Sequence, residues 1–131
     1  MNFVEIEYEE MKSVAKDYRI ILHKPDGKRK YYALKSEECD ILSCIEIEYY
    51  SDNKIKIHCS FTPEKYRRKG YAYNLWSIIT SQNSNKIITV QCNDLSVNIA
   101  LKLGFQISKT REFKRWNAYY LYKNPSNDSS K

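Results

Sequence analysis

The chain of 131 residues lacks the features that mark membrane-spanning and secreted proteins. It contains no run of about 18 or more apolar residues, which argues against a membrane-spanning helix. Its N-terminus, Met-Asn-Phe-Val-Glu-Ile-Glu, is acidic and alternating, whereas a secretory signal starts basic and continues apolar. We therefore expect a cytoplasmic protein with no membrane partner.

Closely spaced metal ligands are also missing. The four cysteines form no Cys-x-x-Cys pair, and only two histidines are present. A structural zinc site needs ligands in close pairs, and disulfides are rare in cytosolic proteins. We predict buried free thiols and no bound metal.

What the chain does contain fits one small globular domain. Apolar residues make up 42% and charged residues 29%, which are ordinary values for such a domain. We assign residues 1–123 to a single domain and predict that the polar tail, residues 124–131, is disordered. The net charge of +6 suits an anionic partner such as nucleic acid, acidic lipid or a phosphate-rich cofactor, without choosing among them.

Periodicity predicts the elements of the first half of the chain. Residues 7–17 have helical spacing, although residues 4–8 also alternate like a strand. Residues 19–23 and 30–34 flank a Pro-Asp-Gly turn, which predicts a hairpin. A second hairpin is expected from residues 41–50 and 54–61, with its glutamates facing lysines across the two strands. In the second of these strands, alternation places Ile55, Ile57, Cys59 and Phe61 on one face.

The second half of the chain predicts alternating helices and strands. Helices are expected at about 71–81 and 94–103, with Asn93 or Asp94 as the N-cap and Gly104 just beyond the end of the second helix. Strands are expected at 87–92, 105–108 and 116–123. This order predicts a mixed α/β fold in layers.

The most informative stretch is the basic loop between a predicted strand and a predicted helix, residues 61–72. The first amides of a helix lack intrahelical partners, and the helix dipole adds positive charge there. Gly70 lets the backbone approach a ligand closely, and Arg67, Arg68 and Lys69 add charge. The loop is therefore a candidate phosphate site.

The loop, Arg67-Arg68-Lys69-Gly70-Tyr71-Ala72, resembles the cofactor motif of GNAT acyltransferases, Arg/Gln-x-x-Gly-x-Gly/Ala. Residues 93–105 are similar to the second signature of that family, in which an Asn opens a helix ending in Lys-Leu-Gly-Phe. The resemblance covers about residues 41–123. It implies a central, twisted, mostly antiparallel sheet with helices on its faces and a splay between the strands before and after the loop.

The resemblance also implies a cofactor, acetyl-CoA, whose diphosphate would lie on the loop amides and whose pantetheine arm would follow the preceding strand. The residues expected to contact it are Cys59, Ser60, Phe61, Arg67, Arg68, Lys69, Gly70, Tyr71, Ala72, Tyr73, Asn93 and Asn98. The reaction would be direct attack of an amine on the thioester.

The catalytic residues are less defined. The family often carries a Tyr as general acid in the second helix, where this chain has Ala100, and Tyr120 on the last strand is a candidate substitute. The candidates for the base are His58, whose ordinary pKa is near neutrality, and Glu46 and Glu48 on the adjacent strand. The alternative interpretation is that these glutamates form a solvated face of Glu–Lys pairs.

The acceptor is expected to be an amine. Because the N-terminal region has room for at most one short helix, we expect an open acceptor site suited to a protein, a peptide or a large amine. Two alternatives stay open: a GNAT-like module that binds acyl-CoA without turnover, and, less expected, a basic nucleic-acid-binding protein. The sequence does not decide the assembly, for which a dimer is one option.

Overall fold

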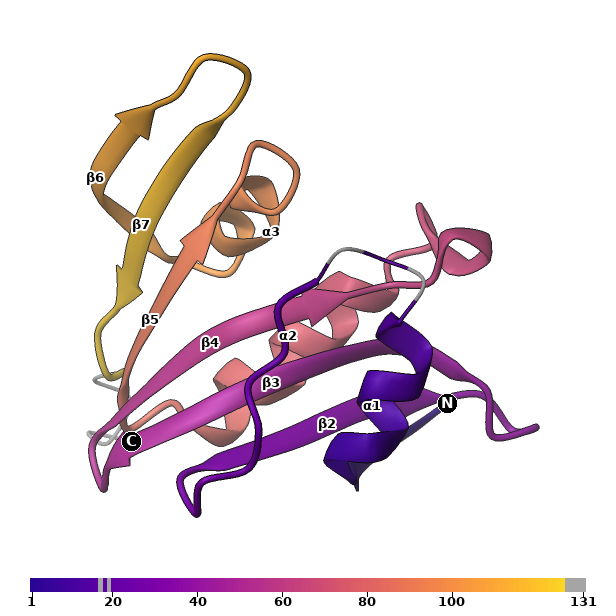
Figure 1. The fold of residues 1–131 in the computed structure, drawn as a ribbon. Helices are drawn as coiled ribbons and strands as arrows, with labels where there is room; N and C mark the ends of the chain where they lie inside the picture. Colours follow the sequence, from indigo (N-terminus) through magenta and orange to yellow (C-terminus); the bar gives the residue numbers. More distant parts are fainter. Residues whose placement is uncertain (17, 19, 127–131) are drawn as a thin grey trace.

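A computed structural model describes residues 1–16, 18 and 20–126. Its elements, in chain order, are β1 (Asn2–Ile6), α1 (Tyr8–Ala15), β2 (Arg29–Lys35), β3 (Ile41–Ser51), β4 (Lys54–Phe61), a short 3-10 turn (Glu64–Tyr66), α2 (Tyr71–Gln82), β5 (Ile87–Cys92), α3 (Val97–Lys102), β6 (Gln106–Glu112) and β7 (Asn117–Lys123). In this part of the chain the strands form one sheet in the order β1-β2-β3-β4-β5-β7-β6 (Figure 1). Neighbouring strands are antiparallel, apart from the parallel pair β4 and β5, so the predicted mixed α/β fold is confirmed.

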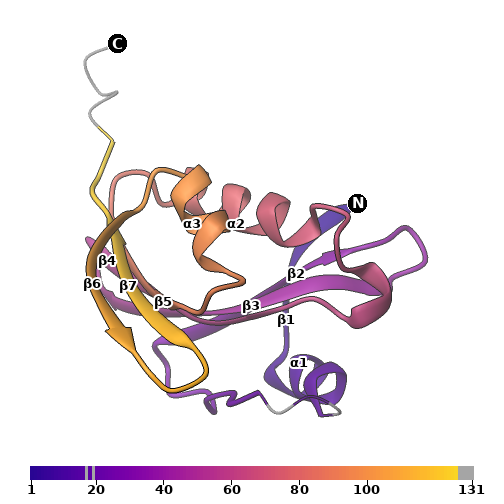
Figure 2. The same cartoon turned by 90° about the horizontal axis from the view of Figure 1, so that it is seen from above.

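Helices cover both faces of the sheet. Figure 2 shows α2 and α3 on one side and α1 on the other. The larger core lies under α2 and α3, where Leu75, Trp76 and Ile79 pack on the strands at helical spacing. A smaller core lies under α1 and includes Met11 and Ala15. Within the described residues no helix is both long and apolar enough to cross a bilayer.

A β-bulge interrupts β4 at His58. Glu46 of β3 lies opposite Cys59, and the next residue, Ile47, lies opposite Ile57, so His58 is the extra residue. Ile57 therefore faces the larger core, while Cys59 and Phe61 face the smaller one. The prediction that Cys59 and Phe61 share a face with Ile55 and Ile57 is wrong, because the bulge reverses the alternation.

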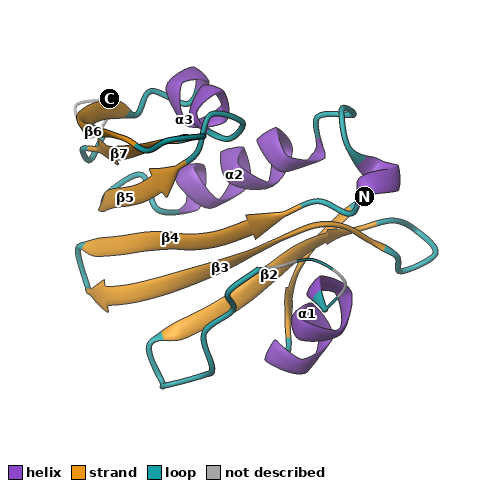
Figure 3. Cartoon of the chain, turned by 45° about the horizontal axis from the view of Figure 1, so that its top comes forward, coloured by secondary structure: helices purple, strands orange, loops and turns teal. Residues whose placement is uncertain are grey.

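The predicted splay is present between β4 and β5. Their pairing runs only from Lys54–Ile87 to Ile57–Val90, and the two strands then diverge (Figures 1 and 3). Beyond these paired residues, no strand in the described part of the chain pairs with residues 58–61 of β4 on the β5 side.

Three predicted elements need correction. Residues 20–26 form no strand, and β2 pairs with β1 instead of forming a hairpin with 19–23, of which Arg19 lies outside the described residues. The second helix begins at Val97, after a turn, so its N-cap is Ser96 rather than Asn93 or Asp94. The strand predicted at 105–108 continues to Glu112, because it pairs with β7 along its length. Gly104, with φ of 91°, follows α3 as predicted.

Candidate functional site

The loop between β4 and α2 has the backbone of an anion site. Arg68 and Gly70 both have positive φ, at 65° and 82°, and Gly70 is the residue that precedes α2. Turns that mix left- and right-handed residues direct successive N–H groups to one side, where they form a concave anion site. No side chain caps the start of α2.

The amides of this loop are free to bind a ligand. Among the described residues, no protein group accepts a hydrogen bond from the backbone N–H groups of Arg68 through Tyr73, six consecutive residues. The first paired amide after the loop is that of Asn74, which donates to the Gly70 carbonyl at 3.0 Å. Unpaired amides at a helix start carry the positive end of its dipole, so the loop attracts anions.

A cavity of about 630 Å³ adjoins these amides, between the end of β4, the start of α2 and the region of α3. Nine residues predicted to contact the cofactor line it: Ser60, Phe61, Arg67, Arg68, Gly70, Tyr71, Ala72, Tyr73 and Asn93. Three do not. The Cys59 side chain is buried in the core on the other face of the sheet, and Lys69 and Asn98 are exposed outside the cavity lining.

Six residues that were not among the predicted cofactor contacts also line the cavity: Thr62, Tyr66, Trp76, Leu95, Ser96 and Ile99. Trp76, only 2% exposed, fixes one wall because its indole N–H donates to the Ser60 hydroxyl at 2.7 Å. Leu95 is 86% exposed, which is unusual for a leucine and offers the cavity an apolar edge. The available signal for Leu95 in the sequence was its position two residues after Asn93.

Asn93 shapes the turn on the far side of the cavity. Its side-chain oxygen accepts hydrogen bonds from the backbone N–H groups of Leu95 and Ser96, both at 2.9 Å. This turn places α3 after the end of β5. Asn93 therefore stabilises the turn before α3 instead of capping the helix as predicted, and its position in the lining leaves a ligand contact open to its amide group.

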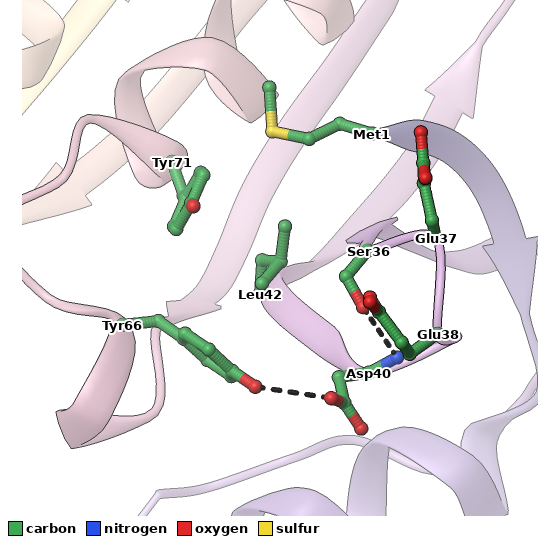
Figure 4. Close-up of a pocket in the computed structure, with 8 residues that line it drawn as sticks. All are labelled: Met1, Ser36, Glu37, Glu38, Asp40, Leu42, Tyr66 and Tyr71. Carbon is green, nitrogen blue, oxygen red and sulfur yellow. Dashed lines mark hydrogen bonds between the residues drawn. The ribbon is translucent and has the colours of Figure 1, made fainter.

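A second pocket, of about 430 Å³, lies beside Tyr66 and Tyr71 (Figure 4). Its other walls are acidic, with Glu37, Glu38 and Asp40 in the lining. The Tyr66 hydroxyl donates to Asp40 at 3.4 Å. Because carboxylates repel phosphates, this pocket is a poor candidate for the phosphate end of a cofactor.

The candidate bases form a polar cluster on the opposite face of the sheet. Glu46 is fully buried, and its carboxylate accepts hydrogen bonds from the backbone N–H and Nδ1 of His23, at 3.0 and 2.9 Å, and from Arg29 Nη1 at 2.6 Å. Glu48 is paired with His58 Nε2 and lies 3.5 Å from Arg29 Nη2. The two histidine rings are in contact, with centroids 4.9 Å apart. The structure thus brings the predicted His58, Glu46 and Glu48 together and adds His23 and Arg29.

These contacts correct the interpretation of a solvated Glu–Lys face. Glu48 does lie opposite Lys56 in the strand register, but the ion pairs of Glu46 and Glu48 go to Arg29 and to histidines. The glutamates are buried because β2 supplies Arg29 and the segment after α1 covers them with His23. Neither partner is adjacent to them in sequence.

The cluster sets the charge state of its members. Burial, opposed by the hydrogen bond that His58 donates to Glu48, lowers the pKa of His58 below its ordinary value. The pKa of Glu48 is also lowered, because the hydrogen bond from His58 and the charge of Arg29 together outweigh its burial. At neutral pH the pair is therefore a neutral imidazole and a carboxylate.

His23, Glu46 and His58 also have the composition of a metal site, with one potential ligand atom each, all within 4.8 Å of one another. Both oxygens of Glu46, however, already accept protein hydrogen bonds, and the Arg29 guanidinium supplies positive charge to it. A divalent cation would have to compete with that guanidinium.

The candidate acids lie apart from the cluster. Tyr120 pairs with Gln91 of β5, and its ring lies under the Lys109 amine at 5.9 Å. In the described part of the chain no hydrogen bond or ring contact joins Tyr120 to His58. Ala100 is fully buried in the larger core, and its methyl group offers no proton to a leaving group.

No family model matches the sequence, and no curated protein matches it. Solved structures do match. The spermidine N-acetyltransferase of Vibrio cholerae, as a variant, aligns over 100% of both chains with a TM-score of 0.78 and 9% identity. The ribosomal-protein-S18-alanine N-acetyltransferase of Escherichia coli aligns over 98% of this chain and 97% of its own, with a TM-score of 0.77 and 8% identity. At such identities the likeness defines the fold, and this chain has the fold of the GNAT N-acetyltransferases.

Proposed function

We propose that the protein is an N-acyltransferase that moves an acetyl group from acetyl-CoA to a primary amine. One observation carries the proposal: six consecutive unpaired amides adjoin a cavity at the end of β4, in a chain with the GNAT fold. Unsatisfied backbone donors are rare in proteins unless water or a ligand satisfies them. The diphosphate of coenzyme A provides acceptors of matching charge.

The loop suits a diphosphate in space as well as in charge. A Cβ built on Gly70 would meet no atom within 4 Å, so the space in front of this residue is open. Arg67 and Arg68 line the same cavity and add positive charge. Arg67 is held there by its Nε, which donates to the Thr62 carbonyl at 2.9 Å.

The splay offers the place for the pantetheine arm. Among the described residues no strand pairs with residues 58–61 of β4 on the β5 side, so their backbone groups are available to the amides of an extended ligand. The cavity lining includes Ser60 and Phe61 from this stretch. Acetyl-CoA would supply the thioester, and a backbone N–H of this strand would polarise its carbonyl.

A primary amine is the acceptor class that this arrangement favours. The similar structures are named for acetyl transfer to spermidine and to an alanine of a ribosomal protein, which are both primary amines. In this chain the region between β1 and β2 contains the single short helix α1 and an irregular segment, 20–26, in its described residues. We propose an open acceptor site that admits a large amine or a peptide.

A melting curve with acetyl-CoA tests the proposal. A ligand at about a hundred times its Kd stabilises the folded state by about 2.7 kcal/mol, which raises the Tm by several degrees for a domain of this size. Adenosine monophosphate, which has no diphosphate, serves as the control and should give a much smaller shift. An unchanged Tm at millimolar acetyl-CoA would refute cofactor binding.

A second candidate function is binding of acyl-CoA without turnover. It is favoured by the buried Ala100 at the position where a general acid could lie in the second helix. A panel of amines incubated with stoichiometric protein and labelled acetyl-CoA separates the two: stabilisation by acetyl-CoA without any transferred label indicates a binding module.

A further inference from the structure

The polar cluster lies next to the splay but on the other face of the sheet from the cofactor cavity. His58 follows Ile57, the last residue of β4 that pairs with β5. Ser60 and Trp76 mark the cavity side, whereas His58, Glu46 and Glu48 lie on the side of α1. The cluster therefore lies beside the point where β4 and β5 diverge, on the face of the sheet opposite the cavity lining.

His58 is the extra residue of the bulge, and it lies on the α1 face of the sheet beside Glu48. Its Nε2 is held by Glu48, and its side chain keeps 14% exposure. Because the ionised Glu48 can only accept, the hydrogen bond defines His58 Nε2 as the protonated nitrogen. Nδ1 then carries a lone pair, in the way that a carboxylate orients a catalytic imidazole.

We propose that His58 is the general base that takes a proton from the acceptor amine, and that Glu48 is the positioning residue that holds its ring. This inference rests on the proposed function, because it assigns a role in acyl transfer. Its basis is the location of the pair at the splay, its hydrogen bond and its partial exposure.

The surroundings keep the imidazole neutral and ready to accept a proton. Burial lowers the pKa of His58, and the charges of Lys56 on β4 and Arg29 on β2 lower it further. Glu48 and Glu46 on β3 raise the pKa of His58. The His23 ring packs against the His58 ring. The hydrogen bond to Glu48 and the charge of Glu46 partly offset the cost of forming the buried imidazolium.

The chemical step balances without another reactant. An ammonium acceptor gives one proton to His58 Nδ1, and the neutral amine attacks the thioester carbonyl carbon. The C–N bond forms, the C–S bond breaks, and the second amine proton goes to the coenzyme A thiolate. His58 then releases its proton to solvent, so one proton is released for each amide formed.

The pH dependence of kcat tests the proposal on an amine that the wild-type protein acetylates. We expect His58→Gln to lower kcat by about 10²- to 10⁴-fold, the usual contribution of a general base, and to abolish the rising limb of the profile. We expect Glu48→Gln to shift that limb to lower pH, because the pKa of His58 falls when its carboxylate partner is removed. The KM for acetyl-CoA should stay the same in both variants.

The control is Glu10→Gln, which removes a carboxylate from an ion pair with Lys35, at the opposite end of β2 from Arg29. It should leave the profile unchanged. A His58→Gln protein that keeps its rising limb would overturn the proposal while the proposed function stands. The proposal would also be overturned if the rising limb were lost in His23→Gln and kept in His58→Gln, because His23 would then be the base.

A spectroscopic readout covers the case in which no acceptor is found. In the acetyl-CoA complex, ¹⁵N NMR of the histidine rings should show His58 neutral at pH 7, with its proton on Nε2. An imidazolium at pH 8, or the opposite tautomer, would overturn the proposal. So would stabilisation by micromolar Zn²⁺ that is lost in His58→Gln, because the cluster would then be a metal site. A protein that acetyl-CoA does not stabilise would refute the proposed function itself.

Discussion

Gly70→Asp is the most direct test of the phosphate-binding loop. Gly70 has φ of 82° and precedes α2, in the middle of the six unpaired amides. An aspartate there would put a carboxylate into the space that the proposed diphosphate occupies. In the free protein that space is open, since a Cβ at Gly70 meets no atom within 4 Å. We therefore expect a folded protein that binds acetyl-CoA poorly.

The expected magnitudes can be separated. The left-handed backbone costs about 1–2 kcal/mol of stability for a residue with a side chain. Two unit charges about 4 Å apart repel by about 4 kcal/mol near a protein surface, and salt reduces this value. We expect a net loss of about 3 kcal/mol in binding, which is about a hundredfold in Kd, measured by calorimetric titration with acetyl-CoA.

Gly27→Asp is the matched control. Gly27 has the same φ of 82°, and a Cβ added to it would also meet open space, but it lies in the turn before β2, outside the cavity lining. It should lose similar stability and keep the wild-type Kd. Gly70→Asn separates shape from charge and should bind more tightly than Gly70→Asp. A Kd for Gly70→Asp within about threefold of wild type would refute the placement of the diphosphate, since the expected loss is about a hundredfold.

Three further predictions concern stability. Trp76→Phe removes the hydrogen bond to Ser60, so urea denaturation should show a loss of about 1–2 kcal/mol. The pKa values of Glu48 and His58 are lowered in the folded protein, so the unfolded chain binds protons more readily. Stability should be full above about pH 6.5 and fall as the pH decreases, and urea titrations at about pH 7 and 4.5 should show a smaller fall for His58→Gln. Ala100→Tyr should destabilise the fold by at least about 1–3 kcal/mol through overpacking of a fully buried site, and an unchanged midpoint would contradict the burial of this residue.

Local patterns are sufficient to predict the loop and the elements on either side of it. The change from alternating to helical period after Pro63 locates the end of β4 and the start of α2, and Gly70 lies between them with the positive φ that glycine favours. These are short-range features, because each depends on residues a few positions apart. The same holds for Gly104 after α3.

The polar cluster can be predicted only in part, because it depends on contacts between distant segments. No local signal marks the bulge at His58, since Ile55, Ile57, Cys59 and Phe61 continue a perfect alternation. His23 joins the cluster because an irregular segment crosses the sheet. There the backbone N–H of His23 donates to the Glu46 carboxylate and not to a neighbouring strand. The Pro-Asp-Gly turn that follows this segment predicts a strand there instead.

The seam between β4 and β5 has a mechanical consequence. Four residue pairs at one end join β4 to β5, so the sheet consists of two parts, β1–β4 and β5–β7, that are paired only along this short stretch. The separation of β4 and β5 beyond the paired stretch depends on the angle between the two parts of the sheet, and packing at the paired residues influences that angle. Lys54 and Ile87 pair at the start of this stretch and do not line the cavity. Substitutions near them would then change the affinity for the proposed cofactor by changing the angle between the two parts of the sheet.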